Sequence, residues 1–313
     1  MNIDAAGRIA VLIPCYNEEV AIGAVIAGFR AALPDAAIYV FDNNSRDRTV
    51  EIARAAGAHV RREARQGKGA VVRRMFADVE ADTYVLVDGD GTYDAASAPR
   101  LVAALIEECL DMVCASRVAQ GQEAYRAGHR FGNRVLTSLV ARLFGRGLDD
   151  MLSGYRVFSR RFVKSFPALA HGFETETELT VHALSLSMPF AELPTPYRGR
   201  PEGSASKLNT WRDGMRILLA IFVLVKEERP LPFFALLGGL LCLASLLLGW
   251  PVVLTWLETG LVPRLPTALL ATGLMLLGFL SFTCGLVLDT VTHGRREMKR
   301  LAYLAHRAPG HSP

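Results

Sequence analysis

Two long apolar segments limit the folds open to this chain more than any other feature. They cover residues 231–257 and 265–291, and each exceeds the roughly 20 apolar residues that a helix needs to cross a bilayer. Only residues 258–264 join them, so we expect two antiparallel membrane-spanning helices that form a hairpin. A buried hairpin within a soluble protein is the alternative.

The residues around these segments predict their orientation. Trp250 and Trp256 lie toward the connecting residues, as interfacial aromatic side chains do. Basic residues gather on the other side, at Lys226, Arg229, Arg295, Arg296, Lys299, Arg300 and Arg307. By the positive-inside rule, both termini face the cytoplasm. We therefore expect an integral protein of a bacterial-type cytoplasmic membrane, in contact with membrane lipids.

Residues 1–208 show a different pattern, in which short apolar runs alternate with segments of helical periodicity. Such alternation is typical of right-handed βαβ units and a mostly parallel sheet. Ser45 is placed to cap a helix that begins at Thr49. The expected strands are residues 9–13, 38–41, 59–61, 84–87 and 112–115, and the expected helices are 18–33, 49–56, 69–79, 99–108, 132–144 and 174–186.

A further helix, over residues 211–228, follows this part. Its apolar core is too short to cross a bilayer, so we interpret it as an amphipathic helix in the membrane interface, with a helix docked on the soluble domain as the alternative. Small residues such as Gly238 and Gly239 suit helix contacts and leave a homo-oligomer open. The predicted parts are a cytoplasmic domain (1–208), a juxtamembrane helix (209–230), the transmembrane hairpin (231–291) and a basic cytoplasmic tail (292–313).

Composition argues against two classes of function. The formal net charge is only +4. No basic patch interleaved with aromatic residues, helix-turn-helix or RNA-binding motif is present, so we expect no nucleic-acid partner. The five cysteines lack metal-ligand spacing, and we interpret them as reduced thiols of a protein that faces the cytosol.

Asp88-Gly89-Asp90 is the first candidate site. It follows the apolar run Tyr84-Val85-Leu86-Val87, which reads as a buried parallel strand. Two carboxylates this close need a compensating cation, and their oxygens suit Mg²⁺ or Mn²⁺. Ligands of open α/β sheets bind at the carboxyl ends of the strands. The pattern therefore predicts a metal-bound diphosphate here, with a polar turn as the alternative.

Four motifs occur in a recognisable order: Ile13-Pro14-Cys15-Tyr16-Asn17-Glu18-Glu19, Phe41-Asp42-Asn43-Asn44-Ser45-Arg46-Asp47-Arg48-Thr49, Arg65-Gln66-Gly67-Lys68-Gly69-Ala70 and Asp88-Gly89-Asp90. In this order and spacing the chain resembles the family 2 glycosyltransferases. More narrowly, it is similar to the polyisoprenyl-phosphate glycosyltransferases, the group of dolichol-phosphate mannose synthase. The resemblance implies a GT-A type, Rossmann-like domain that binds a nucleotide-sugar and holds Mg²⁺ or Mn²⁺ at Asp88 and Asp90.

The resemblance also implies individual roles on the donor side. In the second motif the family's second aspartate and its glycine are here Asn43 and Asn44. This departure keeps the turn, because asparagine tolerates left-handed backbone angles, but it removes a carboxylate at position 43. A Walker P-loop is excluded, since its sequence is absent. The residues implied to contact the donor are Pro14, Tyr16, Asn17, Glu18, Asp42, Lys68 and Gly89.

A separate stretch resembles the family's acceptor signature, Arg-x-x-Gly-x-Ser-Lys-Leu. This chain carries one extra residue between Arg200 and Gly203, so the register of Arg198 against Arg200 stays open. A planar guanidinium, a hydroxyl and an ammonium together suit a phosphate. The residues expected to hold a polyprenyl phosphate are Arg117, Arg200, Ser206 and Lys207, with Arg130 and Arg134 as further candidates.

Other carboxylates are candidates for the reaction centre. Asp149 and Asp150 precede Ser153-Gly154, similar to the family's Asp-x-x-Ser-Gly stretch, and we prefer Asp150 as a catalytic residue beside Asp88 and Asp90. Three glutamates lie where related enzymes that glycosylate hydroxyls keep a basic carboxylate, but we favour a solvated acidic face for them: Glu174, Glu176 and Glu178.

The expected reaction is metal-dependent, inverting transfer of one sugar from a nucleotide-sugar to a polyprenyl phosphate at the inner face of the membrane. A phosphate monoester, with a second pKa of about 6, is already an ionised nucleophile, so a strong general base is less necessary. One alternative is transfer to a hydroxyl of a lipid or polysaccharide, although the Gln-x-x-Arg-Trp motif of processive synthases is absent. Another is a membrane scaffold with a glycosyltransferase fold and no turnover.

Overall fold

The computed structural model describes residues 7–119, 148–168, 174–201 and 210–310. The chain forms two compact units, residues 1–221 with 299–313, and residues 222–298.

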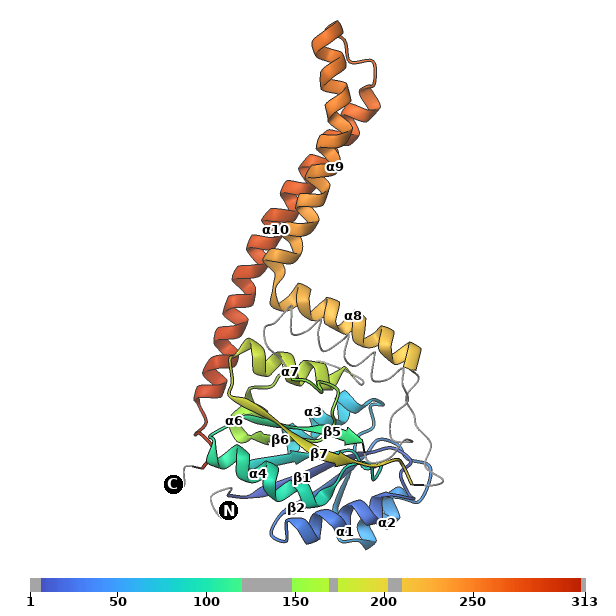
Figure 1. The fold of residues 1–313 in the computed structure, drawn as a ribbon, viewed down its shortest axis with the longest axis vertical. Helices are drawn as coiled ribbons and strands as arrows, with labels where there is room; N and C mark the ends of the chain where they lie inside the picture. The colour runs from blue at the N-terminus through green and yellow to red at the C-terminus, as the bar shows by residue number, and fades with distance from the viewer. Residues whose placement is uncertain (1–6, 120–147, 169–173, 202–209, 311–313) are drawn as a thin grey trace. The chain divides into compact units, whose positions relative to one another are not determined.

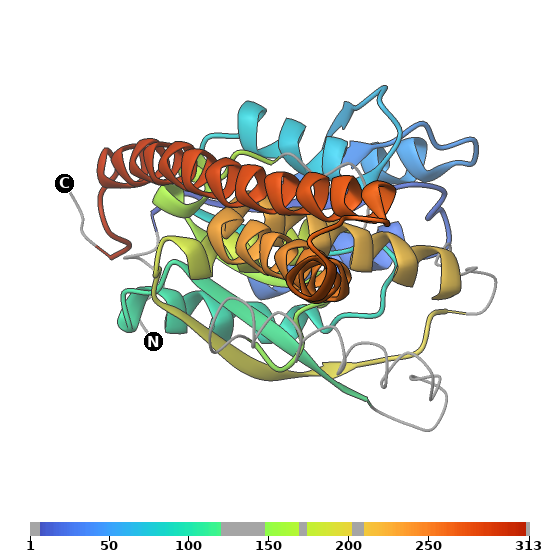
Figure 2. The ribbon, with the colours of Figure 1, turned by 90° about the horizontal axis from the view of Figure 1, so that it is seen from above.

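A seven-stranded sheet organises the first unit (Figure 1), with the strand order β3-β2-β1-β4-β6-β5-β7. All neighbouring strands are parallel except that β6 runs antiparallel to both β4 and β5. β5 and β7 lie side by side over eight residue pairs (Figure 2). The strands are β1 (Ile9–Cys15), β2 (Ala37–Asp42), β3 (His59–Arg62), β4 (Thr83–Leu86), β5 (Met112–Ala119), β6 (Arg156–Ser159) and β7 (Phe190–Tyr197).

Helices cover both faces of this sheet because the strands are apolar on both sides. In β1, Val11 and Ile13 join one buried cluster with Phe29 of α1 and Leu101 of α4. Leu12 belongs to the opposite cluster, which includes residues of α3, α6 and α7. Side chains along a strand alternate between the two faces, so one strand serves two cores. The helices are α1 (Ile22–Ala32), α2 (Thr49–Ala55), α3 (Lys68–Asp78), α4 (Ala98–Glu107), α6 (Arg160–Ser165) and α7 (Thr175–Ser185).

Every strand predicted from the sequence is present, and so is every predicted helix within the described residues. The predicted helix over residues 132–144 lies outside the described residues. The prediction that Ser45 caps α2 is wrong. Its Oγ instead accepts a hydrogen bond from the Asn17 backbone N–H at 2.9 Å, whereas Asp47 Oδ1 accepts from the N–H of Thr49 at 3.0 Å.

The second unit is a helical hairpin of α9 (Pro230–Thr259) and the α10 residues up to 298; α10 as a whole spans Leu265–Leu304. Small residues let the two backbones approach closely: a Cβ on Gly238 would lie 2.8 Å from the carbonyl oxygen of Gly278. Ser245 Oγ donates a hydrogen bond to the Ala271 carbonyl at 2.6 Å, and Ser281 Oγ donates to that of Phe234 at 2.9 Å.

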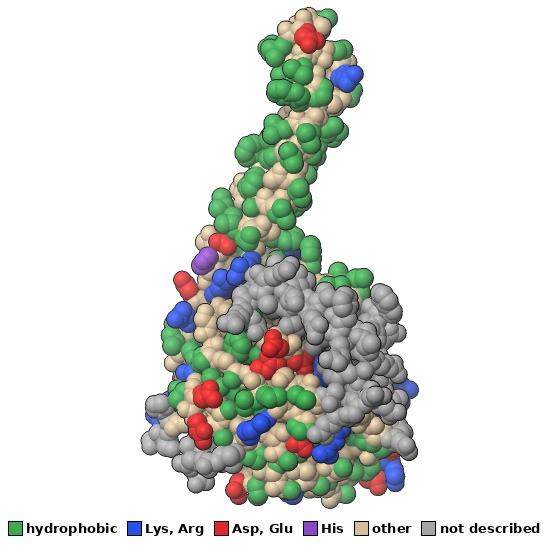
Figure 3. All heavy atoms as spheres, in the orientation of Figure 1, with side chains coloured by type: hydrophobic (Ala, Val, Ile, Leu, Met, Phe, Trp, Pro, Cys, Tyr) green, Lys and Arg blue, Asp and Glu red, His purple; other side chains and the backbone are tan. Residues whose placement is uncertain are grey.

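Both hairpin helices are long and apolar enough to cross a membrane, with mean hydropathies of 2.4 and 2.0. In the most apolar stretch of each helix, only 11% and 22% of the residues are buried. Figure 3 shows hydrophobic side chains along the hairpin on the face drawn, with charged side chains at its tip. A helix in a soluble core would be mostly buried, so this exposure fits lipid contact better.

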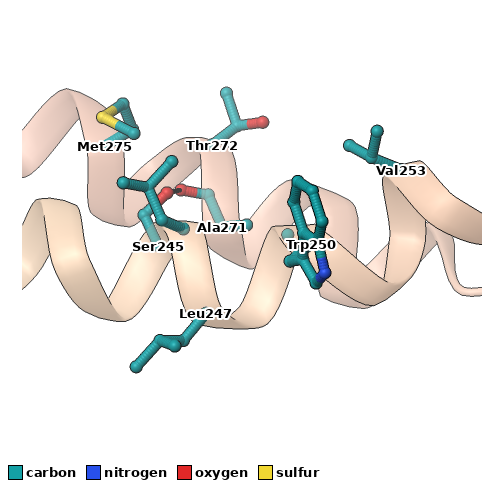
Figure 4. Close-up of a pocket in the computed structure, with 9 residues that line it drawn as sticks. Ser245, Leu247, Trp250, Val253, Ala271, Thr272 and Met275 are labelled. Atoms are coloured by element: carbon teal, nitrogen blue, oxygen red, sulfur yellow. Dashed lines mark hydrogen bonds between the residues drawn. The ribbon is translucent and has the colours of Figure 1, made fainter.

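A shallow groove of about 620 Å³ lies between α9 and α10 (Figure 4). Its floor is the hydrogen-bonded pair Ser245 and Ala271, and Trp250 stands at one end. None of the residues that line it carries a titratable side chain. The groove therefore has no groups for acid–base or metal chemistry, and the candidate active site lies elsewhere.

Candidate active site

The Asp-x-Asp sequence directly follows β4, at the edge where the parallel strands β1, β2 and β4 end. Gly89 is buried between its two aspartates, and a Cβ at this position would lie 2.6 Å from Cys15 Sγ and 3.2 Å from Ile13 Cγ2. Only glycine fits so close to β1. This approach fixes the positions of Asp88 and Asp90 relative to the end of β1.

Asp90 is buried, and both of its carboxylate oxygens have partners. Oδ1 accepts hydrogen bonds from the Thr92 backbone N–H at 3.1 Å and from Thr92 Oγ1 at 2.6 Å. Oδ2 lies 2.7 Å from Nη2 of Arg200. The same guanidinium lies 3.9 Å from the carboxylate of Glu18. Arg200 thus lies at the Asp-x-Asp sequence, whereas Arg198 is largely exposed and lies 3.7 Å from Asp94.

Asp88 is paired with Lys68, the first residue of α3. Lys68 Nζ lies 2.5 Å from Asp88 Oδ1 and 2.5 Å from Glu176 Oε1 of α7. Burial lowers the pKa of Lys68, but the charges of Asp88 and Glu176 outweigh burial and raise that pKa above its usual value. Gly154 permits this cluster, because a Cβ there would clash with Asp88 and lie 3.1 Å from Lys68 Nζ.

The asparagine that replaces the family's second aspartate has a specific structural task. Asn43 Nδ2 donates hydrogen bonds to the carbonyls of Glu63 at 3.0 Å and Arg65 at 2.8 Å, and its Oδ1 accepts from the Gly67 N–H at 2.7 Å. A carboxylate can accept but cannot donate. Asn43 therefore holds in place the residues that precede Lys68. The neighbouring Asn44 has φ 68°, which confirms that asparagine keeps the turn.

The other donor-side residues lie at the ends of β1 and β2. Asp42 is buried, and its Oδ1 accepts a hydrogen bond from the Ser45 N–H at 3.0 Å. Asn17 has φ 53°, and its Oδ1 accepts from the Arg46 N–H at 2.8 Å. Pro14 and Tyr16 are half-buried, and Glu18 is buried. The motif residues thus converge on the edge that carries Asp88 and Asp90.

Arg117 and Asp150 form a bidentate ion pair, with Nε–Oδ2 and Nη2–Oδ1 distances of 2.7 Å. Glu192 of β7, which the sequence analysis missed, accepts hydrogen bonds from the backbone N–H groups of Asp149 at 2.6 Å and Asp150 at 2.8 Å. Burial raises the pKa of Glu192. The role of Glu192 can be recognised only once β7 is known to pair with β5, because that pairing places Glu192 opposite Cys114.

The expectation of a solvated acidic face on α7 is wrong for two of its three glutamates. Glu176 and Glu178 are buried, and Glu176 is held by Lys68. Four acceptor-side candidates lie outside the described residues: Arg130, Arg134, Ser206 and Lys207.

The chemistry of the edge fits a metal-bound diphosphate. Carboxylate oxygens are the ligands that Mg²⁺ and Mn²⁺ prefer. Within residues 7–119, 148–168, 174–201 and 210–310, no group of three or more His, Cys, Asp or Glu side chains forms a closed metal cage. Asp88 and Asp90 are the side chains at this edge that would hold such an ion. The fold and this edge define an α/β domain of the GT-A type.

Comparison with known proteins identifies the family. The family model described as glycosyl transferase family 2 matches residues 10–166. Glycosyltransferase AglJ of Haloferax volcanii is 32% identical over 95% of this chain and 98% of its own length. A dolichyl-phosphate hexose transferase of the same organism is 31% identical over 71% of this chain and 95% of its own length. The chain belongs to glycosyl transferase family 2, and the resemblance drawn from its motifs is confirmed.

A solved structure supports the same fold. Glucosyl-3-phosphoglycerate synthase from Mycobacterium tuberculosis, in complex with Mn²⁺ and uridine-diphosphate-glucose, is similar with a TM-score of 0.54 and 25% identity. The match covers 70% of this chain and 81% of that one. The protein is thus a glycosyltransferase with a GT-A type domain, followed in sequence by a helical hairpin.

Proposed function

We propose that this protein transfers a single sugar from a nucleotide-sugar to a polyprenyl phosphate, with inversion at the sugar and with Mg²⁺ or Mn²⁺ at Asp88 and Asp90. The observation that carries the proposal is the set of buried and half-buried acidic and basic side chains at the ends of β1, β2 and β4. It combines oxygen ligands for a metal with two cations suited to phosphates.

On the donor side, Asp88 and Asp90 would hold the metal, which neutralises charge on the departing diphosphate. Lys68 keeps its positive charge and stands at the N-terminus of α3, where anions are favoured. Tyr16 and Asp42 border the edge where the base and ribose would lie. These are the donor contacts that the motifs predict.

On the acceptor side, Arg117 and Arg200 are the described cations suited to the lipid phosphate. Arg117 is pre-oriented by its bidentate pair with Asp150, which is in turn fixed by Glu192. Such orientation reduces the entropy lost when a phosphate binds. Asp150 is then a residue that positions Arg117, and the phosphate itself is the nucleophile. Ser206 and Lys207 complete the proposed acceptor set.

A lipid acceptor agrees with the apolar helices. α8 (Thr210–Glu228) exposes Met215, Leu218, Leu219 and Phe222, a spacing of three and four residues that places them on one helix face. An exposed apolar face of this kind suits a membrane interface. We propose that α8 lies in that interface, that the hairpin crosses the bilayer, and that the catalytic domain and both termini are cytoplasmic. The dolichyl-phosphate hexose transferase relative supports this class of acceptor.

Transfer to a hydroxyl would need a general base. Of the three glutamates considered for that role, Glu176 already holds the ammonium of Lys68 at 2.5 Å. This contact favours the phosphate acceptor, which needs no strong base.

The decisive experiment uses the full chain in detergent with Mn²⁺ or Mg²⁺, undecaprenyl phosphate and a panel of nucleotide-sugars. Mass spectrometry should detect a lipid-phosphate-sugar with one of the donors, and removal of the metal by a chelator should abolish it. Transfer only to hydroxyl acceptors would contradict the proposed acceptor. Undiminished transfer after chelation would contradict the metal.

A further inference from the structure

Lys68 occupies one of the two carboxylates to which the metal is assigned. Its ammonium contacts Asp88 and Glu176 at the same distance, 2.5 Å, and its side chain is 11% exposed. A cation this close to Asp88 opposes the approach of a second cation, since like charges repel strongly where water is scarce. The site as folded therefore carries its own competitor for the metal.

Glu176 provides a place for that competitor to go. Its side chain is 7% exposed, and its Oε2 has no hydrogen-bond partner in the part of the chain that the structure describes. A buried carboxylate oxygen without a partner is unfavourable. An ammonium group has three donors, so Lys68 can leave Asp88 and bond both oxygens of Glu176.

We propose that Lys68 is an exchangeable internal counter-ion: it neutralises Asp88 before the metal binds, and Glu176 is the positioning residue that holds it when the metal takes Asp88. The proposal rests on the proposed metal role of Asp88 and Asp90. The flexible four-carbon stem of lysine permits a short displacement that the planar fork of arginine would not.

Charge substitutions at the two residues should shift metal affinity in opposite directions. In K68Q the cation beside Asp88 is gone, while Arg200 stays beside Asp90, and Mn²⁺ should bind on the order of tenfold more tightly than in the parent. In E176Q Lys68 is left with Asp88 as its one anionic partner, and Mn²⁺ should bind on the order of tenfold more weakly. In the double variant K68Q/E176Q, Mn²⁺ should bind as tightly as in K68Q, because Glu176 acts only through Lys68.

Mn²⁺ binding to the full chain in detergent can be measured by electron paramagnetic resonance without nucleotide or acceptor. E178Q is the matched control, since Glu178 is a buried glutamate of the same helix and the carboxylates acting on Lys68 are Asp88 and Glu176. It should change affinity much less than E176Q does, because Glu178 is not among the carboxylates that act on Lys68. Circular dichroism checks that each variant folds. If K68Q does not fold, the double variant, which removes both charges together, can still be compared with the parent.

The outcomes separate this inference from the function that it rests on. If the parent binds no Mn²⁺, or if D88N/D90N binds it equally well, both the metal role and the exchange are overturned. If the parent binds Mn²⁺ at Asp88 and Asp90 but the double variant is no tighter than the parent, the exchange alone is overturned. Weaker binding in the double variant than in K68Q would make Glu176 a ligand and would also overturn it.

Discussion

Gly89 provides the most direct test of how the fold positions the aspartates. In Gly89→Ala the new Cβ would lie 2.6 Å from Cys15 Sγ, which is 0.8 Å inside the 3.4 Å at which ordinary contact begins. Cys15 is 3% exposed and Ile13 is fully buried, so neither side chain can move into solvent. Overpacking of this kind costs about 1–3 kcal/mol.

For a domain of this size, that cost lowers the melting temperature by roughly 2–12 °C. Thermal unfolding of the full chain, followed by circular dichroism in detergent, measures it. The double variant C15A/G89A removes the clashing sulfur and should recover most of the loss, which a general sensitivity of the loop would not. Gly199→Ala is the matched control, because nothing lies within 4 Å of its Cβ position. An unchanged melting temperature in Gly89→Ala would refute the reasoning.

Four further predictions follow from the site and its surroundings. Asp90→Ala should reduce transfer activity by at least about a hundredfold in a metal-supplemented assay, and full activity would remove the metal role of this residue. Asn43→Asp cannot donate to two carbonyls and should lower unfolding free energy by about 1–3 kcal/mol in a thermal melt, although it restores the family's residue. Arg117→Met should weaken the apparent affinity for polyprenyl phosphate more than that for the nucleotide-sugar; equal changes in the two KM values would contradict an acceptor role. Burial lowers the pKa of His182 in the folded protein to about 3, so as the pH falls this histidine takes up a proton in the unfolded chain before it does so in the folded one. The free energy of unfolding should therefore fall by at most about 1.4 kcal/mol per pH unit below about pH 6.5. His182→Gln should flatten this slope in thermal melts recorded at several pH values.

The sequence predicts the strands that carry the site, because their patterns are local. The β1 motif and Asp88 lie at the ends of strands whose apolar runs are clear in the sequence. Lys68 begins a helix whose apolar periodicity is equally clear. β6 was not predicted because it passes directly into α6, so its short apolar run has no turn or loop to mark its end. β7 was not predicted because Pro194 and Pro196 argue against a strand.

The contacts between distant segments of the site could not be predicted from the sequence, for a related reason. The pairing of Lys68 with Glu176 joins residues on α3 and α7, and nothing in either segment indicates the other. Charge pattern alone made Glu176 a solvated surface residue, although its partner makes burial tolerable. Likewise, Glu192 is meaningful only once β5 and β7 are paired. Chemistry was therefore predictable where one segment carries it, and not where packing assembles it.

The two prolines of β7 have a consequence for the solubility of the catalytic domain. β7 ends the strand order of the described sheet, and β5 is its one neighbouring strand there; only an isolated bridge joins its last residue, Tyr197, to Tyr93. Residues two apart on a strand direct their N–H groups to the same side, and Pro194 and Pro196 have none to offer. The row of donors on one side of β7 is thus interrupted twice. An incoming strand from another molecule cannot form a continuous ladder there, which protects the domain from edge-to-edge aggregation.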